Sequence, residues 1–180
     1  MNSIIIYGSQ YGSTRRYAEK LSELTSIPAV SFKESPHISG QDTIIYMGGL
    51  YAGGVLGLSK TLRSISPQEI RRLFIVTVGL SDPSKPVTTE NVHKSLQKQL
   101  SSELFQHAKL FHLRGAMDYG ELHLGHRTAM ALLYQSLRRM PSEKWTEEDR
   151  ALMDTYGKQV DFVDFEALEP VIRELNKESI

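Results

Sequence analysis

The hydrophobic residues of this chain fall into two kinds of segment. Short, continuous apolar runs rich in β-branched and aromatic residues are typical of strands buried on both faces of a parallel sheet. Such runs occur at Ser3–Ile6, Ala29–Phe32, Thr43–Gly48, Leu73–Val78 and Lys109–Leu113.

Between these runs, apolar residues recur at the spacing of amphipathic helices. The residues expected to face inward are Tyr17, Ala18, Leu21 and Leu24, then Leu58, Leu62 and Ile65, then Val92, Leu96 and Leu100, then Met130, Leu133 and Leu137, and finally Phe165, Leu168, Ile172 and Leu175. Strands that alternate with helices in this way form right-handed β-α-β units. The pattern therefore predicts an α/β fold with a parallel sheet and helices on both faces.

The region at about 115–160 departs from this alternation. A Gly-rich polar segment is followed by a helix at 126–139 and a highly charged segment from Pro141 to Gly157, in which Thr146 and Asp149 are a candidate helix cap. Asp164 is expected to cap the final helix, which Pro170 bends or delays. Since no linker or internal repeat is evident, we expect residues 1–180 to form one domain with an excursion after the fifth strand.

Charge and composition exclude several classes of protein. Lys and Arg together number 21, and Asp and Glu together also number 21, so the formal net charge is zero. This balance gives no indication of a nucleic-acid partner. The absence of cysteine excludes disulfides, thiolate catalysis and iron–sulfur ligation. Because no signal peptide or apolar run of membrane-spanning length is evident, we expect a cytoplasmic protein without a transmembrane segment.

A turn of small and polar residues joins the first predicted strand to the first predicted helix. It contains Ser9, Gln10, Tyr11, Gly12, Ser13 and Thr14. The free N–H groups of such a turn and of the first helical residues point at one spot, where the helix dipole favours negative charge. Hydroxyl side chains add further donors, so a phosphate group is the natural ligand.

This loop differs from the two common nucleotide-binding loops. Gly12 is followed by Ser13 and Thr14, without the lysine of a P-loop. The spacing of Gly8 and Gly12 does not match the G-x-G-x-x-G pattern of dinucleotide-binding proteins. The loop therefore suits the terminal phosphate of a mononucleotide, and an ordinary turn that caps a helix is the structural alternative.

Two further loops are candidates for the same site. Glycines surround Leu50, Tyr51 and Ala52 after the third predicted strand, and Gly79 begins a polar loop after the fourth. With a strand order of 2-1-3-4-5, these loops and the phosphate loop meet at the carboxyl edge of the sheet. One loop would then bind a phosphate, and the other two would flank a flat ring.

The order hydroxyl-x-x-Gly-hydroxyl-Thr from Ser9 to Thr14 resembles the FMN phosphate loop of the flavodoxin family. The segments Gly48–Gly54, Leu113–Tyr119 and Val163–Glu166 extend the resemblance over nearly the whole chain, toward the branch that contains menaquinone-dependent protoporphyrinogen dehydrogenases. The resemblance implies a flavodoxin-like three-layer sandwich with a five-stranded parallel sheet of order 2-1-3-4-5, and FMN as the cofactor.

The same resemblance implies the cofactor-binding residues. They are Ser9, Gln10, Tyr11, Gly12, Ser13 and Thr14 for the phosphate, and Leu50, Tyr51, Ala52, Gly53, Gly54, Gly79, Leu80, Ser81 and Asp82 around the ring. Tyr51 either stacks on the ring or is a half-buried loop aromatic. Gly53 and Gly54 either present a peptide group to the flavin or only allow the chain to turn. Asp82 either lies near the flavin or caps a turn.

The resemblance implies an FMN-dependent oxidoreductase that transfers electrons between a reduced organic substrate, with protoporphyrinogen as one candidate, and a quinone or similar acceptor. The sequence indicates no catalytic residue and no oligomeric state. One alternative is a non-enzymatic electron carrier that docks redox proteins, although such carriers are usually acidic and this chain is neutral. The other is a flavodoxin scaffold without a flavin. The excursion is a candidate lid or docking platform.

Two groups of side chains outside these loops allow several interpretations. His123 and His126 lie three positions apart in a segment that does not guarantee the geometry of a metal site, so we expect no metal there. The two histidines either form a proton relay or are ordinary surface residues. Arg127, Arg138 and Arg139 flank the apolar residues of the helix at 126–139. Core packing is the favoured role of that helix, and peripheral contact with a membrane is the alternative.

Overall fold

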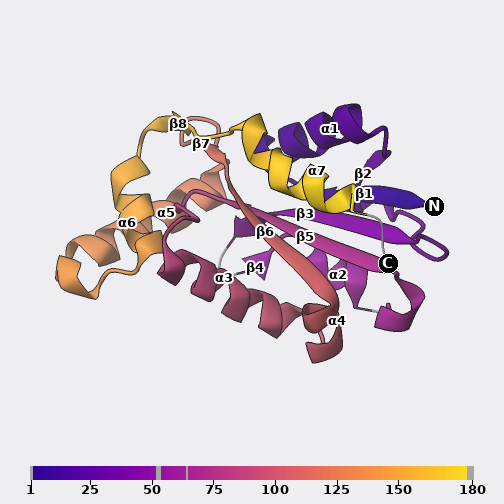
Figure 1. Ribbon diagram of the computed structural model, residues 1–180. Coiled ribbons are helices and arrows are strands. Elements are labelled where there is room, and N and C mark those ends of the chain that lie inside the picture. Colours follow the sequence, from indigo (N-terminus) through magenta and orange to yellow (C-terminus); the bar gives the residue numbers. More distant parts are fainter. Residues whose placement is uncertain (1, 52–53, 64, 178–180) are drawn as a thin grey trace.

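The computed structural model describes residues 2–51, 54–63 and 65–177. Its main sheet has parallel strands in the spatial order β2-β1-β3-β5-β6 (Figure 1). Counted along the chain, these strands have the order 2-1-3-4-5, which confirms the predicted flavodoxin-like α/β topology. Their bounds are β1 Ser3–Gly8, β2 Ala29–Ser31, β3 Thr43–Tyr51, β5 Arg72–Gly79 and β6 Ala108–Arg114. A short strand, β4 (Gly54–Val55), pairs antiparallel with the end of β3.

Helices lie on both faces of this sheet, so the three-layer arrangement is also as predicted (Figure 1). The α-helices are α1 Ser13–Thr25, α2 Leu58–Leu62, α3 Pro86–Gln99, α4 Ser102–His107, α5 Leu124–Arg138, α6 Glu147–Thr155 and α7 Glu169–Leu175. Single 3₁₀ turns are η1 Phe32–Glu34, η2 Pro67–Glu69, η3 Ser142–Lys144 and η4 Phe165–Leu168. Within the described ranges, no helix is both long and apolar enough to cross a lipid bilayer.

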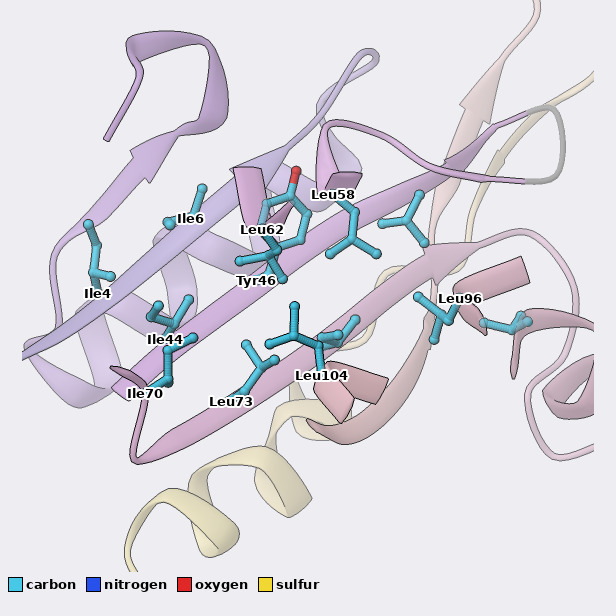
Figure 2. Close-up of a cluster of buried hydrophobic side chains, with 13 residues drawn as sticks. Ile4, Ile6, Ile44, Tyr46, Leu58, Leu62, Ile70, Leu73, Leu96 and Leu104 are labelled. Carbon is cyan, nitrogen blue, oxygen red and sulfur yellow. The ribbon is translucent and has the colours of Figure 1, made fainter. Parts of the chain in front are cut away.

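The sheet is buried on both sides because consecutive residues of a strand point to opposite faces. Figure 2 shows the core on one face, where the strands contact α2, α3 and α4. Its buried residues include Ile4, Ile6, Ile44, Tyr46, Leu58, Leu62, Leu73, Ile75, Val92, Leu96 and Leu104. The second core lies under α1 and α7 and includes Ile5, Tyr17, Leu21, Ile45, Met47, Phe74, Val76, Leu168 and Val171. Continuous apolar strands are therefore a requirement of this architecture.

Several predicted inward positions are wrong. Leu24 is half-exposed because it lies in the last turn of α1, and Ile27, which follows the helix, packs against the core there. Phe165 also remains partly exposed, because it belongs to the turn η4 that precedes α7. In α5, Leu137 is buried but Leu133 is exposed, so the expected core packing of that helix is largely wrong.

The excursion is joined to the main sheet at its base. Strands β7 (Ala116–Asp118) and β8 (Gln159–Asp161) pair antiparallel, so that its two ends lie side by side. Helices α5 and α6 lie between them in the chain and extend beyond the sheet (Figure 1). A capping box formed by Thr146 and Asp149 begins α6, as the sequence indicated.

Hydrogen bonds to Tyr17 hold together the two segments that join the excursion to the main domain. The Tyr17 hydroxyl of α1 donates to the carbonyl of Arg114 and accepts from the N–H of Asp164, at 2.8 and 2.9 Å. Asp164 in turn accepts from the N–H of Glu166, which confirms its capping role. Pro170 lies in the first turn of α7, so it delays the α-helix as predicted.

Candidate functional site

The carboxyl ends of the central strands bring three loops together. Gly8 at the end of β1 pairs with Gly48 of β3, and Gly48 pairs with Thr77 near the end of β5. The segments that follow these strands therefore start next to one another at one edge of the sheet. This is the edge at which open α/β sheets bind ligands.

The loop after β1 has the geometry of an anion-binding turn. Gly12 precedes α1 with φ of +94°, a value that glycine adopts without strain. Its N–H donates to the Ser9 hydroxyl at 3.1 Å, and its carbonyl accepts the first helical hydrogen bond, from the N–H of Arg16. The first turn of α1 contains no acidic residue. The N-terminus of the helix is therefore electropositive and free of a competing carboxylate.

Two neighbouring N–H groups of this loop converge on one oxygen. The backbone N–H groups of Gln10 and Tyr11 are directed at the hydroxyl of Tyr51 as hydrogen-bond donors that lower its pKa. Burial raises the pKa of Tyr51, and these two hydrogen bonds act in the opposite direction because they favour the phenolate. The loop thus already holds an oxygen atom with paired amide donors, which is the donor chemistry that a phosphate oxygen requires.

Thr14 and Tyr51 lie beside the glycines of β3. Thr14 is buried, and a Cβ atom on Gly49 would lie 3.3 Å from its hydroxyl oxygen and 2.6 Å from the Tyr51 ring. The rings of Tyr51 and Tyr11 are tilted by 52° at a centroid distance of 6.4 Å. Tyr51 therefore leans toward the phosphate loop, and its stacking on a flavin stays a prediction.

The second loop is partly a hairpin rather than the open loop that was expected. Leu50 pairs with Val55, and Tyr51 pairs with Gly54. The predicted site residues Ala52 and Gly53 lie outside the described residues. The side chain of Gln99 in α3 anchors the hairpin: it accepts from the N–H of Val55 at 2.7 Å and donates to the Val55 carbonyl at 3.2 Å. Gln99 thus takes the place of a neighbouring strand, a role that the sequence does not signal.

The third loop is positioned by Arg114 at the end of β6. Its guanidinium donates to the carbonyl of Leu80 at 3.0 and 3.2 Å and lies over the ring of Phe162, 3.6 Å from the centroid. Gly79 accepts a hydrogen bond from the N–H of Gly115 and lies against Leu50 of the hairpin. The loops after β3 and β5 are therefore in contact, and the loop after β5 is also connected to the base of the excursion.

Asp82 acts as a turn residue in this structure. Its carboxylate accepts from the N–H of Ser84 at 2.9 Å. Hydrogen bonds from the backbone and side chain of Ser84 lower the pKa of Asp82 below its usual value. Ser81 and Leu80 precede it on the half-buried part of the same loop. A further role of Asp82 toward a ligand stays a prediction.

The excursion contacts the phosphate loop, which sequence reasoning missed. The Tyr11 hydroxyl shares a hydrogen bond with His126 Nδ1, and burial raises its pKa while the nearby backbone N–H of His123 lowers it. The His123 ring caps α5 by accepting from the N–H of His126, and the two rings lie 3.8 Å apart. The two histidines therefore hold the start of α5 against the tip of the phosphate loop.

The arginines that follow the phosphate loop are engaged elsewhere. Arg15 pairs with Glu19 on α1 at 2.6 Å, and Arg16 pairs with Asp161 of β8 at 2.7 Å. Both pairs are substantially exposed. The backbone, rather than a cationic side chain, is therefore the main electropositive feature of the loop.

A histidine pair lies between the sheet and α3, on the opposite side from α1. His112 of β6 shares a 2.7 Å hydrogen bond between its Nδ1 and the Thr77 hydroxyl. Its Nε2 is buried without a described hydrogen-bond partner, and its ring lies 5.3 Å from that of His93. Burial and the neighbouring His93 lower the pKa of His112 from 6.5 to about 4. His112 is therefore neutral at physiological pH.

This lowered pKa predicts an acid-sensitive fold. A histidine whose pKa is lower in the folded state binds its proton more readily when unfolded, so the stabilisation is complete above about pH 6.5 and is lost as the pH falls toward 4. We expect the loss to reach about 2 kcal/mol, with allowance for partial exposure. In urea titrations over this pH range, His112→Gln should lose correspondingly less stability than the wild type. The control His107→Gln, at an exposed position, should keep the wild-type pH profile; an unchanged profile for His112→Gln would contradict the assignment.

The chain was compared with known protein families and structures. A family model described as Flavodoxin domain matches residues 4–143. No curated protein matches the chain. Among solved structures, oxidised flavodoxin 1 from Bacillus cereus is 16% identical, with a TM-score of 0.39, over 63% of this chain and 84% of that chain. Two single-site mutants of flavodoxin from Pseudomonas aeruginosa are 19% and 20% identical, each with a TM-score of 0.38, over 85% of this chain and 99% of theirs.

Proposed function

This chain belongs to the flavodoxin domain family, whose model matches well over half of it, and from this premise we propose that it binds FMN and transfers electrons between a reduced organic substrate and a quinone or similar acceptor. A flavodoxin-like domain implies flavin-based electron transfer. The observation that carries the proposal for this chain is the start of α1, where Gly12 has a positive φ, the Ser9 hydroxyl lies against its N–H, and the first helical turn contains no acidic residue.

The residues of the loop fit a phosphate monoester. The first-turn N–H groups of α1 have no partner within the helix, and Ser9, Ser13 and Thr14 supply hydroxyls at the same end. In the proposed complex a phosphate oxygen replaces the Tyr51 hydroxyl at Gln10 and Tyr11. The absence of a lysine suits a group that is bound by amides and hydroxyls alone.

The other two loops would hold the ring. Leu50, Tyr51 and Gly54 lie at the end of β3, Gly79–Asp82 follow the neighbouring strand β5, and Leu50 lies against Gly79. The Gln99 and Arg114 side chains fix the backbones of these loops and so would orient the ring without touching it. Bound FMN supplies the electron-transfer chemistry, whereas the chain supplies position and environment.

Sequence resemblance and net charge point to the class of substrate. The segments Gly48–Gly54 and Leu113–Tyr119 resemble those of menaquinone-dependent protoporphyrinogen dehydrogenases, which makes protoporphyrinogen the first substrate to test. The neutral net charge also favours a small-molecule substrate over docking to a basic redox protein. The excursion beside the site supplies additional surface for such a molecule.

The proposal is tested in two stages. Purified protein should quench the fluorescence of added FMN at a stoichiometry of one, and the loaded protein should oxidise protoporphyrinogen with a menaquinone analogue as acceptor. Absence of FMN binding would overturn the whole proposal. Binding without turnover, together with reduction in two well-separated one-electron steps, would instead favour an electron carrier.

A further inference from the structure

Helix α5 leaves much of its apolar surface uncovered. In this helix only Leu137 is buried. Leu124 is 81% exposed, Leu132 68% and Leu133 45%, and Met140, just after the helix, is 39% exposed. Leu132, Leu133 and Ala129 lie on exposed positions of the helix, and the exposed Met140 follows its end. Large apolar side chains gathered in this way on a solvent-facing helix indicate an interaction surface.

The same surface carries only positive formal charge. The segment from Leu124 to Met140 contains Arg127, Arg138 and Arg139 but no Asp or Glu. Among the described residues, no carboxylate lies within ion-pair distance of these three arginines. The guanidinium of Arg138 lies over the ring of Tyr134 at 6.0 Å, which leaves it accessible. Apolar residues next to unpaired arginines are characteristic of helices that lie in a membrane interface.

Two acidic residues of α6 are engaged on the side that faces α3. Glu147 pairs with Lys85, and Glu148 accepts hydrogen bonds from the side chain of Asn91. Both partners belong to α3 or the residue before it, so these carboxylates face the main domain. These two carboxylates therefore do not balance the arginines of α5.

We propose that α5, together with Met140, docks this protein on an anionic lipid surface. Leucine and methionine side chains enter the boundary between head groups and acyl chains, and the arginines contact the phosphates of anionic lipids. A second copy of the chain fits this face less well, because two such helices would bring arginines of like charge together without carboxylates to separate them. The proposal stands independently of whether the protein binds FMN.

Docking through α5 would also determine how the carboxyl edge of the sheet lies relative to the lipid surface. Because His123 and His126 hold the start of α5 against Tyr11, the docked helix would lie beside the phosphate loop. The carboxyl edge of the sheet would then be held close to the lipid surface.

Sedimentation with lipid vesicles tests the proposal on the full-length chain. We expect the wild type to bind vesicles of phosphatidylcholine that contain about 30% phosphatidylglycerol, to bind pure phosphatidylcholine far more weakly, and to be released by high salt. The triple variant Arg127→Gln, Arg138→Gln, Arg139→Gln should lower the partition coefficient by about 100-fold. The double variant Leu132→Glu, Leu133→Glu should lower it at least about tenfold. Leu24→Glu, at a half-exposed leucine of α1, is the matched control and should bind as the wild type does.

Three results would overturn the proposal. The first is that the wild type does not bind vesicles that contain phosphatidylglycerol. Another is a Leu132→Glu, Leu133→Glu variant that binds them as the wild type does, which would show that the apolar residues take no part. The third is a wild type that is dimeric in size-exclusion chromatography and becomes monomeric in this variant without any vesicle binding, which would assign the face to a second copy. Circular dichroism of each variant would show that binding is compared between folded proteins.

Discussion

Replacing Ser13 by aspartate is expected to raise the dissociation constant for FMN about 100-fold or more while leaving the fold at least as stable. Ser13 is the first residue of α1, at the end where the proposed phosphate binds. A carboxylate there would repel a phosphate dianion across a few ångströms of partly solvated space. The same carboxylate interacts favourably with the helix dipole, by about 0.5 kcal/mol. Loss of binding is thereby separated from loss of folding.

A matched substitution controls for charge and helix position. Ser102 is the first residue of α4, so Ser102→Asp makes the same change at the same helical position away from the site. Fluorescence titration with FMN should show wild-type affinity for this control, and urea denaturation should show that both variants are folded. Equal affinity of Ser13→Asp and the wild type would exclude the N-terminus of α1 as the phosphate site.

Replacing Gly8 by alanine is expected to lower the free energy of unfolding by about 3 kcal/mol. A Cβ atom on Gly8 would lie 2.2 Å from the carbonyl oxygen of Leu56, a backbone atom that cannot rotate away. Movement of that carbonyl would also break its 2.7 Å hydrogen bond from the hydroxyl of Tyr46, whose side chain is fully buried. Overpacking and an unsatisfied buried hydroxyl each cost about 1–3 kcal/mol.

Thermal unfolding measures this effect directly. For a domain of this size a loss of about 3 kcal/mol corresponds to a fall in Tm of about 6–12 °C. Gly125→Ala is the control, because a Cβ there meets only ordinary contacts at 3.6 Å and the residue lies within α5. Alanine in a helix should leave the stability unchanged or raise it by up to about 1 kcal/mol. A Tm for Gly8→Ala within about 2 °C of the wild type would contradict the close approach of Leu56.

Local pattern accounts for most of the fold. The apolar runs at Thr43–Gly48 and Leu73–Val78 identified central strands because burial on both faces removes the polar alternation of an exposed strand. Asp164 and Thr146 identified helix starts because a capping side chain acts on backbone groups only two or three residues away. The loop from Ser9 to Thr14 could be recognised in the same way, because its glycine and its hydroxyl groups lie within one turn of the chain.

Contacts between residues far apart in the sequence could not be predicted from local pattern. The anchoring of the hairpin by Gln99 joins residues 44 positions apart. The contact of Tyr11 with His126 spans 115 positions. Neither side chain has an unusual local pattern, because a glutamine or tyrosine acquires such a role only when another segment is brought within hydrogen-bond distance.

The amino-acid sequence by itself determined the α/β class, the five parallel strands and the glycine turn that begins the first helix, because these depend on the periodicity of burial and on backbone groups close along the chain. Only the tertiary structure decided that the carbonyl of Leu56 lies against Gly8 and that Leu133 of α5 faces solvent rather than the core. It also decided that the excursion contacts the phosphate loop. Helical spacing shows that a helix has an apolar side, but whether that side is covered depends on where the rest of the chain packs.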